Sequence, residues 1–158
     1  MNMTQTIIDE TNAIWAAMSM PKIRVALDEG AHLPTRAHGT DAGADLRCIE
    51  GFTVPAHDSI VIDTGVHVEL PPLTKGEIKS KSGLNINNCI LTTGLIDEGF
   101  DGTIKVHVYN LGSEPYTFEA GDKVTQLCVS PVFYPTYEQA DEIKGGDRGS
   151  NGYGSTGR

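Results

Sequence analysis

The sequence lacks a long apolar run, an even set of cysteines and a signal-like N-terminus. No stretch approaches the ~18 consecutive apolar residues that a membrane-spanning helix needs. The N-terminus has no basic segment followed by an apolar one, which argues against a secretory signal. The cysteines are odd in number and far apart, so they fit neither a disulfide framework nor a CxxC metal site. We therefore expect reduced thiols, no membrane partner and a cytoplasmic location, which would be the host cytoplasm for a viral protein.

Positive charge is also scarce. The chain has 12 Lys and Arg against 21 Asp and Glu, a formal net charge of −9. Proteins that bind nucleic acid in general need a positive field, so no nucleic-acid partner is expected. A small anionic ligand is compatible with this charge, provided that its site gathers a few Lys or Arg side chains and a metal ion.

The chain divides into a central region and two unlike ends. Its 158 residues predict a single domain. Residues 1–20 place apolar side chains at roughly helical spacing before Pro21, which predicts an N-terminal extension that is helical or disordered. Residues 21–144 predict the folded core. Residues 145–158 have almost no apolar side chain to offset the entropy of ordering, so they predict a flexible glycine-rich arm.

The central region alternates short β-type runs with turn signals. Ile104, Val106 and Val108 would share one face of a strand, because alternate residues of a strand point the same way. One short helix is expected after Ser82. Many short strands at this spacing indicate an all-β barrel, sandwich or jelly roll, with strands expected at 22–27, 59–63, 65–70, 76–81, 102–110, 115–120 and 123–132.

The C-terminal arm carries two residues that composition alone does not explain. Arg148 precedes the glycine run, and Tyr153 is an aromatic residue among glycines with no core to enter. Glycines let main-chain N–H groups approach phosphate oxygens, an Arg offers a bidentate charge, and an exposed Tyr can stack on a base. The plainer interpretation is an ordinary disordered end. The arm contains no Walker A spacing.

Several residues of the core region are candidates for chemistry, although each alone has a plainer interpretation. Lys81 with Ser82-Gly83 could face an anion, or could be an ordinary strand end. Asp97 follows two aliphatic residues and is expected to be buried enough to act as a general base, unless it only forms a β-turn. Asp45 and Gln126 lie in strand-like contexts, where such residues are usually edge or turn residues. The five histidines show no metal-ligand spacing.

The order of these signals is more specific than any one of them. Five segments resemble the five ordered motifs of the trimeric dUTP diphosphatases (dUTPases), and the resemblance runs from about Lys22 to the end of the chain. The segments are DAGADL at 41–46, KSGL at 81–84, GLIDEGFDG at 94–102, GDKVTQL at 121–127 and RGSNGYGSTG at 148–157.

The resemblance implies a fold, an assembly and a reaction. The fold would be a distorted jelly roll and the assembly a homotrimer, with each active site shared between subunits and closed by the C-terminal arm. The reaction would be Mg²⁺-assisted hydrolysis of dUTP to dUMP and pyrophosphate, which lowers dUTP and supplies dUMP for thymidylate synthesis. Asp97 would be the general base that directs water at the α-phosphorus. Asp45 would reach Mg²⁺ through water.

The resemblance also assigns the substrate contacts. The uracil edge would bind to main-chain groups of Gly94, Leu95 and Ile96 and of the backbone near Lys105. Phe100 would pack on the deoxyribose and exclude a 2′-hydroxyl. The remaining contacts would be Tyr153, which stacks on the uracil, and a phosphate-binding set consisting of Lys81, Ser82, Gly83, Gln126, Arg148, Gly154 and Ser155.

Some positions depart from the family pattern and leave alternatives open. Lys81 and Lys123 stand where the family has Arg, which keeps the charge but loses the bidentate fork. A dCTP deaminase, alone or bifunctional with dUTPase activity, would need a Glu where this chain has His107. A second alternative is a nucleotide-gated regulatory protein that uses the site to switch partner binding.

Overall fold

The regular secondary structure of the described chain is almost entirely β. The computed structural model describes residues 22–143 and 145–146. Within them lie ten strands and one short helix, α2 (Ser82–Asn88). The predicted extension at 1–20 and nearly all of the predicted arm lie outside the described residues. The strands are β1 (Arg24–Leu27), β2 (Gly43–Arg47), β3 (Phe52–Val54), β4 (Ser59–Asp63), β5 (Val66–Glu69), β6 (Thr74–Ser80), β7 (Ile90–Ile96), β8 (Lys105–Asn110), β9 (Tyr116–Phe118) and β10 (Lys123–Pro131).

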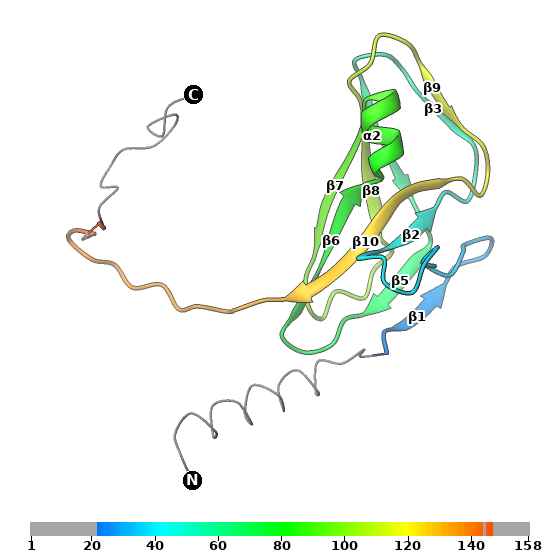
Figure 1. Cartoon of the computed structure of the whole chain (residues 1–158). Coiled ribbons are helices and arrows are strands. Elements are labelled where there is room, and N and C mark those ends of the chain that lie inside the picture. The colour runs from blue at the N-terminus through cyan, green and yellow to red at the C-terminus, as the bar shows by residue number, and fades with distance from the viewer. Residues whose placement is uncertain (1–21, 144, 147–158) are drawn as a thin grey trace.

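One large sheet organises the fold. It has six strands in the order β2-β10-β6-β7-β8-β4, and every neighbouring pair is antiparallel. Two small antiparallel pairs, β1-β5 and β3-β9, flank it, and α2 packs near the upper end of the long strands (Figure 1). The predicted all-β class is therefore confirmed.

The core forms from the alternation that the sequence predicts. In and beside β8, Ile104, Val106 and Val108 are at most 1% exposed, whereas Lys105 faces outward. Burial of each such side chain contributes about 1.5–3 kcal/mol relative to exposure. The rest of this core comes from the large sheet and from the two small strand pairs, and consists of Leu46, Cys48, Val54, Val66, Val68, Leu70, Ile78, Ile90, Ile96, Phe118, Val124 and Leu127.

Three strands, β2, β3 and β7, lie outside the strand ranges expected from the sequence. β3 has three residues, too few for a visible alternation. β7 contains Thr-Thr-Gly at its centre, which is typical of a turn. A glycine suits this strand position because it permits a close approach of the neighbouring strand: a Cβ at Gly94 would lie 3.1 Å from Ile78 Cγ1.

The short helix begins close to its expected position, and β10 is the last strand of the described chain. α2 begins at Ser82, as predicted, and ends at Cys89, whose left-handed backbone (φ 56°) donates its N–H to Asn85 O at 3.1 Å. After Pro131 the chain leads away from the sheets (Figure 1). Phe133 and Tyr137 on this outgoing segment are 91% and 93% exposed.

Candidate active site

A hairpin that opens partway along its length forms a pocket. β7 pairs with β8 only as far as Thr93 and His107. Beyond that point Gly94–Ile96 pair with β6, while Lys105 pairs with Asp63 of β4. The two halves of the hairpin therefore diverge, and a pocket of about 450 Å³ lies between them, lined by Ile78, Gly94, Leu95, Ile96, Phe100, Gly102, Thr103, Ile104 and Lys105.

The walls of this pocket suit a flat heterocycle with polar edges. On the side facing β8, no described strand pairs with Gly94–Ile96, so main-chain groups of this edge are available to a ligand. Most side chains on the remaining walls are apolar, with Thr103 and Lys105 as the polar ones, an arrangement common in sites that bind small ligands. Phe100 is 46% exposed, and its ring lies so close to Gly102 that a Cβ there would be 2.7 Å from Cζ. The predicted uracil and deoxyribose contacts are thus brought together at one pocket.

Asp97 directly follows this edge of the pocket. It begins a tight turn in which Phe100 N donates to Asp97 O at 3.2 Å and Gly99 has φ 83°. The expected burial of Asp97 is wrong for the single chain: the residue is exposed. Strand alternation explains this, because Ile96 is buried and the next side chain must point the other way.

The turn after Asp97 is held by a carboxylate that the sequence did not single out. Glu98 Oε2 accepts hydrogen bonds from Leu73 N at 2.8 Å and from the Tyr134 hydroxyl at 2.6 Å. The Tyr134 hydrogen bond, followed by that from Leu73, lowers the pKa of Glu98 below its ordinary value. Further along, Thr103 Oγ1 donates to Asp63 Oδ2 at 2.7 Å. These contacts fix both ends of the loop that carries Phe100.

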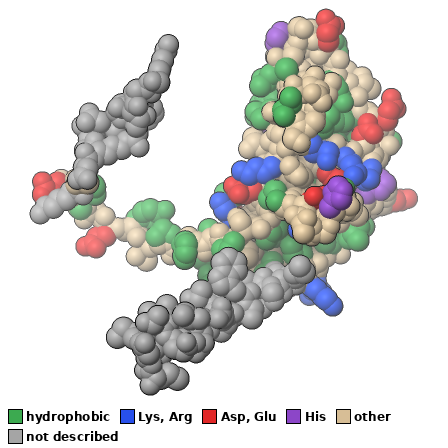
Figure 2. Space-filling model, in the orientation of Figure 1, with side chains coloured by type: hydrophobic (Ala, Val, Ile, Leu, Met, Phe, Trp, Pro, Cys, Tyr) green, Lys and Arg blue, Asp and Glu red, His purple; other side chains and the backbone are tan. Residues whose placement is uncertain are grey.

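A second cluster lies where β2, β10 and the start of α2 meet. Asp45 is 6% exposed and forms ion pairs with Lys81 and with Lys123, the latter at 2.7 Å. Burial raises the pKa of Asp45, but the hydrogen bonds from Lys123 and Lys81 outweigh it and hold that pKa below its ordinary value. One carboxylate against two ammonium groups leaves a net positive charge. In Figure 2, Lys and Arg side chains gather across the middle of the face that carries β2 and β10.

Gln126 belongs to the same cluster. Its main chain is opposite Asp45 on β2 and Lys79 on β6, and its Nε2 donates to Ser80 O at 3.1 Å. Gly43 leaves the space for this side chain, because a Cβ at Gly43 would lie 2.5 Å from Gln126 Oε1. A second pocket of about 480 Å³ adjoins the cluster; its lining includes Arg47, Lys81, Gly83, Leu84, Asn87, Tyr116 and Lys123.

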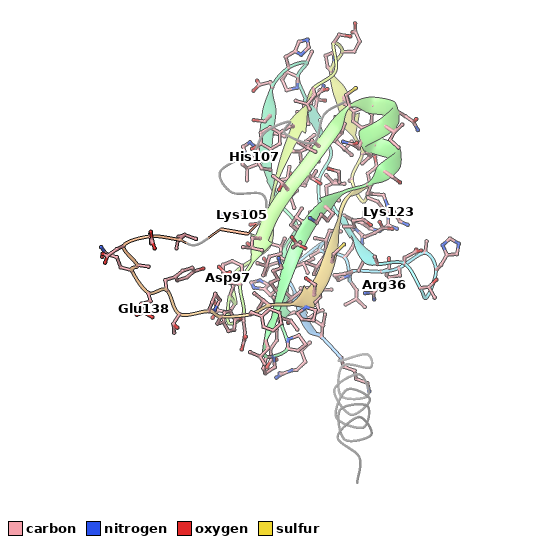
Figure 3. The ribbon with its side chains drawn as sticks, turned by 60° about the vertical axis from the view of Figure 1, so that its left-hand side comes forward. Arg36, Asp97, Lys105, His107, Lys123 and Glu138 are labelled. Carbon is pink, nitrogen blue, oxygen red and sulfur yellow. The ribbon has the colours of Figure 1, made fainter. Side chains whose placement is uncertain are left out.

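Within one chain, Asp97 and its pocket lie apart from the cluster of Asp45, Lys81, Lys123 and Gln126. Gly76 of β6 pairs with Ile96, next to Asp97, whereas Lys81 follows the opposite end of β6. At about 3.3 Å per residue, the chain from Gly76 to Lys81 spans about 17 Å. Figure 3 likewise shows Asp97 and Lys105 on one side of the ribbon and Lys123 on the other. The predicted residues Arg148, Tyr153, Gly154 and Ser155 lie outside the described residues.

His107 lies next to the opening of the hairpin but does not line the pocket. Its Nε2 is 2.9 Å from Ser59 Oγ, its Nδ1 is 2.8 Å from the Tyr109 hydroxyl, and the two rings are stacked. The residue at the position where a deaminase would need a proton-shuttling Glu is therefore engaged in contacts along β4 and β8.

A base-sized pocket and a separate lysine-rich cluster on an all-β body fit the class of nucleotide-binding enzymes. The dUTPase family model matches residues 29–157. The chain is 38% identical to the deoxyuridine 5′-triphosphate nucleotidohydrolase of Clostridium acetobutylicum, over 83% of this chain and 92% of that protein. It is 35% identical to the human mitochondrial deoxyuridine 5′-triphosphate nucleotidohydrolase, over 84% of this chain and 53% of that protein.

Solved structures give the same result. The dUTPase of Staphylococcus bacteriophage 80alpha with dUpNHpp superposes with a TM-score of 0.81 at 26% identity, covering 88% of this chain and all (100%) of that one. A dUTPase variant from phage phi11 of S. aureus, described with a structural Mg(II) ion, gives a TM-score of 0.72 at 26% identity, over 79% and 100% of the two chains. The chain belongs to the dUTPase family. The predicted family, jelly-roll-like fold and enzyme class are confirmed.

Proposed function

We propose that the protein hydrolyses dUTP to dUMP and pyrophosphate, with Asp97 as the general base that orients and deprotonates a water for in-line attack on the α-phosphorus. The observation that carries this proposal is the position of Asp97, directly after the pocket edge formed by Gly94–Ile96. A nucleotide whose base occupies the pocket places its sugar beside Phe100 and its α-phosphate outside, where an exposed carboxylate can reach a water.

Base selection follows from the nature of the pocket edge. Main-chain N–H and C=O groups cannot exchange donor for acceptor, so an edge that pairs with uracil leaves groups unpaired against cytosine. Each unpaired buried group costs about 1–3 kcal/mol, and two would give a discrimination of about 10² or more. Phe100, packed on the deoxyribose, would exclude a 2′-hydroxyl by contact.

An active site shared between subunits explains why Asp97 and the lysine cluster lie apart in one chain. Asp97 and the phosphate-binding set of Lys81, Ser82, Gly83 and Gln126 lie at opposite ends of the β6-β7 ladder, too far apart to hold one α-phosphate. We therefore propose a homotrimer in which one subunit contributes the base pocket and another the lysine cluster. Exposed apolar side chains offer surface for such contacts, including Val61, Leu91, Leu95, Phe133 and Tyr137.

The donor set fits an outer-sphere Mg²⁺. No group of three or more His, Cys, Asp or Glu in residues 22–146, as far as they are described, could enclose a metal ion. Asp45 already holds two ammonium groups, so one water-mediated contact is the role left to it. Mg²⁺ keeps several waters and binds substrate phosphates in enzymes of this kind, where it neutralises charge on the triphosphate.

The proposal also covers the two ends of the chain and the cellular role of the protein. Residues 145–158 are proposed to act as an arm over the substrate, with Arg148 on the γ-phosphate, Tyr153 on the uracil, and Gly154 and Ser155 on further phosphate oxygens. The core is proposed to run over 21–144, after an extension at 1–20. The supply of dUMP for thymidylate synthesis is the proposed cellular role, in the cytoplasm, where the free thiols of all three cysteines are expected to stay reduced. No helix of the described chain is long and apolar enough to cross a bilayer.

Substrate assays test the proposal directly. Purified protein with Mg²⁺ should release pyrophosphate from dUTP and far less from dCTP, dTTP or UTP. Ammonia release, or equal turnover of dCTP, would instead support the deaminase alternative. The regulatory alternative makes a different prediction, namely that dUTP binds but no pyrophosphate is formed.

A further inference from the structure

His67 connects the β1-β5 pair to the loop that carries Phe100. Its Nδ1 lies 2.7 Å from the main-chain oxygen of Asp101, and its Nε2 lies 3.3 Å from Asp28 Oδ1. The main chain of Asp28 is held in turn, because its N–H donates to Gly65 O at 2.9 Å. The imidazole thus bridges the Asp28 carboxylate, just after β1, and the middle of the loop.

Both partners of this imidazole are hydrogen-bond acceptors. A carbonyl oxygen and a carboxylate oxygen can be satisfied together only if both ring nitrogens carry a proton, as in the imidazolium form. A neutral ring has one N–H and must leave its other nitrogen lone pair facing an acceptor. The two acceptors then compete for one proton, and whenever that proton lies on Nε2, toward Asp28, the bond to Asp101 is lost.

The charges around His67 favour the protonated form. Asp28, Asp63 and Asp101 lie on the strand ends and the loop that surround it, and the neighbouring Arg24 is neutralised by an ion pair with Glu69 at 2.8 Å. The Asp101 carbonyl, followed by the Asp28 carboxylate, raises the pKa of His67 above its ordinary value of about 6.5.

The bond to Asp101 acts at the substrate pocket. Asp101 lies between Phe100 and Gly102, which both line the pocket and are packed tightly against each other. Glu98 and Thr103 hold the ends of the loop and the bond from Phe100 N to Asp97 O closes its turn, while the bond from His67 is the contact made at Asp101. We infer that His67 is a positioning residue, which in its protonated form holds the Phe100 loop in the geometry that binds the nucleoside.

The direction of the pH effect follows from the sign of the shift. A raised folded-state pKa means that the contact is fully present at low pH and is lost as pH rises through that pKa. The loop contacts serve the bound nucleoside in the ground state and the transition state alike, so the loss should appear in KM rather than kcat. One hydrogen bond of ordinary net strength corresponds to a rise in KM of about three- to tenfold. This inference rests on the proposed function, since it takes the pocket to hold the nucleoside of dUTP.

Two substitutions separate the halves of the bridge. The amide nitrogen of Asn matches Nδ1 of His, and that of Gln matches Nε2. His67→Asn should keep the bond to Asp101 at every pH, which gives a low KM without the rise. His67→Gln should lose that bond at every pH, which gives a high KM with little pH dependence. His57→Asn is the matched control, because His57 is exposed and its positive φ of 56° is one that Asn adopts readily.

The experiment measures KM and kcat for dUTP between about pH 5.5 and pH 9, the range over which a shifted His titrates. The wild type and His57→Asn should show the same rise in KM, and titration of the substrate phosphates is common to all variants. A rise that persists in His67→Asn, or a low KM in His67→Gln at every pH, would overturn the role of His67.

Amide hydrogen exchange of residues 98–103, expressed as protection factors, reports the bridge without substrate. Protection should fall with rising pH in the wild type and not in His67→Asn. If dUTP is hydrolysed but the protection of residues 98–103 does not fall with pH, the role of His67 is refuted and the proposed function still stands. A fall in protection with no turnover of dUTP at any pH would refute the proposed function, and with it the link from the bridge to KM.

Discussion

The Lys123 ammonium lies 2.7 Å from the Asp45 carboxylate, across the β2-β10 pair, in a position where Asp45 is 6% exposed. Lys81 approaches the other oxygen of the same carboxylate from the end of β6. One buried acid thus links three strands of the large sheet through two lysines, and the protein's stability should depend on its charge.

Asp45→Asn should therefore destabilise the fold. The substitution keeps the shape of the side chain but leaves two partly buried ammonium groups without a counter-charge. We expect a loss of about 1–3 kcal/mol in the free energy of unfolding, less than for a fully buried pair because both lysines retain some solvent contact. Urea titration of the variant and of Glu114→Gln, an exposed carboxylate elsewhere, measures it. Equal midpoints for the two variants would contradict the prediction.

The same ion pairs predict how stability depends on acid. The folded-state pKa of Asp45 lies below its ordinary value, so its contribution is complete above the unfolded pKa and is lost as pH falls through the folded one. The wild type should lose more stability than Asp45→Asn between about pH 5 and pH 2. Parallel acid-unfolding curves would show that the Asp45 charge contributes nothing.

Gly43→Ala should weaken substrate binding through Gln126. The added Cβ would lie 2.5 Å from Gln126 Oε1, so the side chain of Gln126 must move away from its present position. We expect a rise in KM for dUTP of about three- to tenfold, the size of one or two lost hydrogen bonds. Gly39→Ala is the matched control, because nothing lies within 4 Å of a Cβ at that position.

A double variant tests the cause of that effect. If Gly43→Ala acts by displacing Gln126, then Gln126→Ala should raise KM by a similar factor, and the combination should raise it little further. Fully additive effects would mean that the added methyl group disturbs the site by another route.

Local pattern predicted much of this fold, and pairing over long sequence distances accounts for most of what it missed. The alternation of Ile104, Val106 and Val108 predicted the buried face of β8, and the helix begins at Ser82 as expected. Nothing local indicates that Asp45 meets Lys123, because that contact depends on the register of β2 against β10.

The pocket shows the same limit. The GLIDEGFDG segment was found from its sequence, but the divergence of β7 from β8 at Gly94 depends on where β4 and β6 take over the pairing. The exposure of Asp97 follows from the alternation of β7, a strand whose central Thr-Thr-Gly is typical of a turn. His67 gave no signal in the sequence, because both of its partners lie more than 30 residues away, at separations of 34 and 39.

Asp97→Asn should nearly abolish turnover while substrate still binds. The amide keeps the shape of the side chain but cannot accept a proton from water, so the loss should appear in kcat, by about 10²–10⁴-fold. Binding of dUTP, measured by calorimetry with Mg²⁺, should stay within a few-fold of the wild type, because the pocket edge at Gly94–Ile96 is untouched. Glu50→Gln, an exposed carboxylate away from the pocket, is the control. Unchanged turnover would remove Asp97 from the mechanism.

A chain that stops after Asp147 should separate assembly from catalysis. It retains every described strand and the outgoing segment with Phe133 and Tyr137, so it should assemble as the full chain does, which sedimentation can measure. It lacks Arg148 and Tyr153, and should therefore lose the proposed contacts to the γ-phosphate and the uracil. We expect poor hydrolysis of dUTP, since an arm that closes over the substrate excludes other water and completes the site.

Two point variants refine that test. Arg148→Lys keeps a charge but not a bidentate fork, and Tyr153→Phe keeps the stacking ring. If the arm acts as proposed, Arg148→Lys should lower kcat/KM and Tyr153→Phe should leave it nearly unchanged. A truncated chain that trimerises and hydrolyses dUTP at the full rate would show that residues 148–158 take no part in the site. It would refute the proposed contacts of both Arg148 and Tyr153.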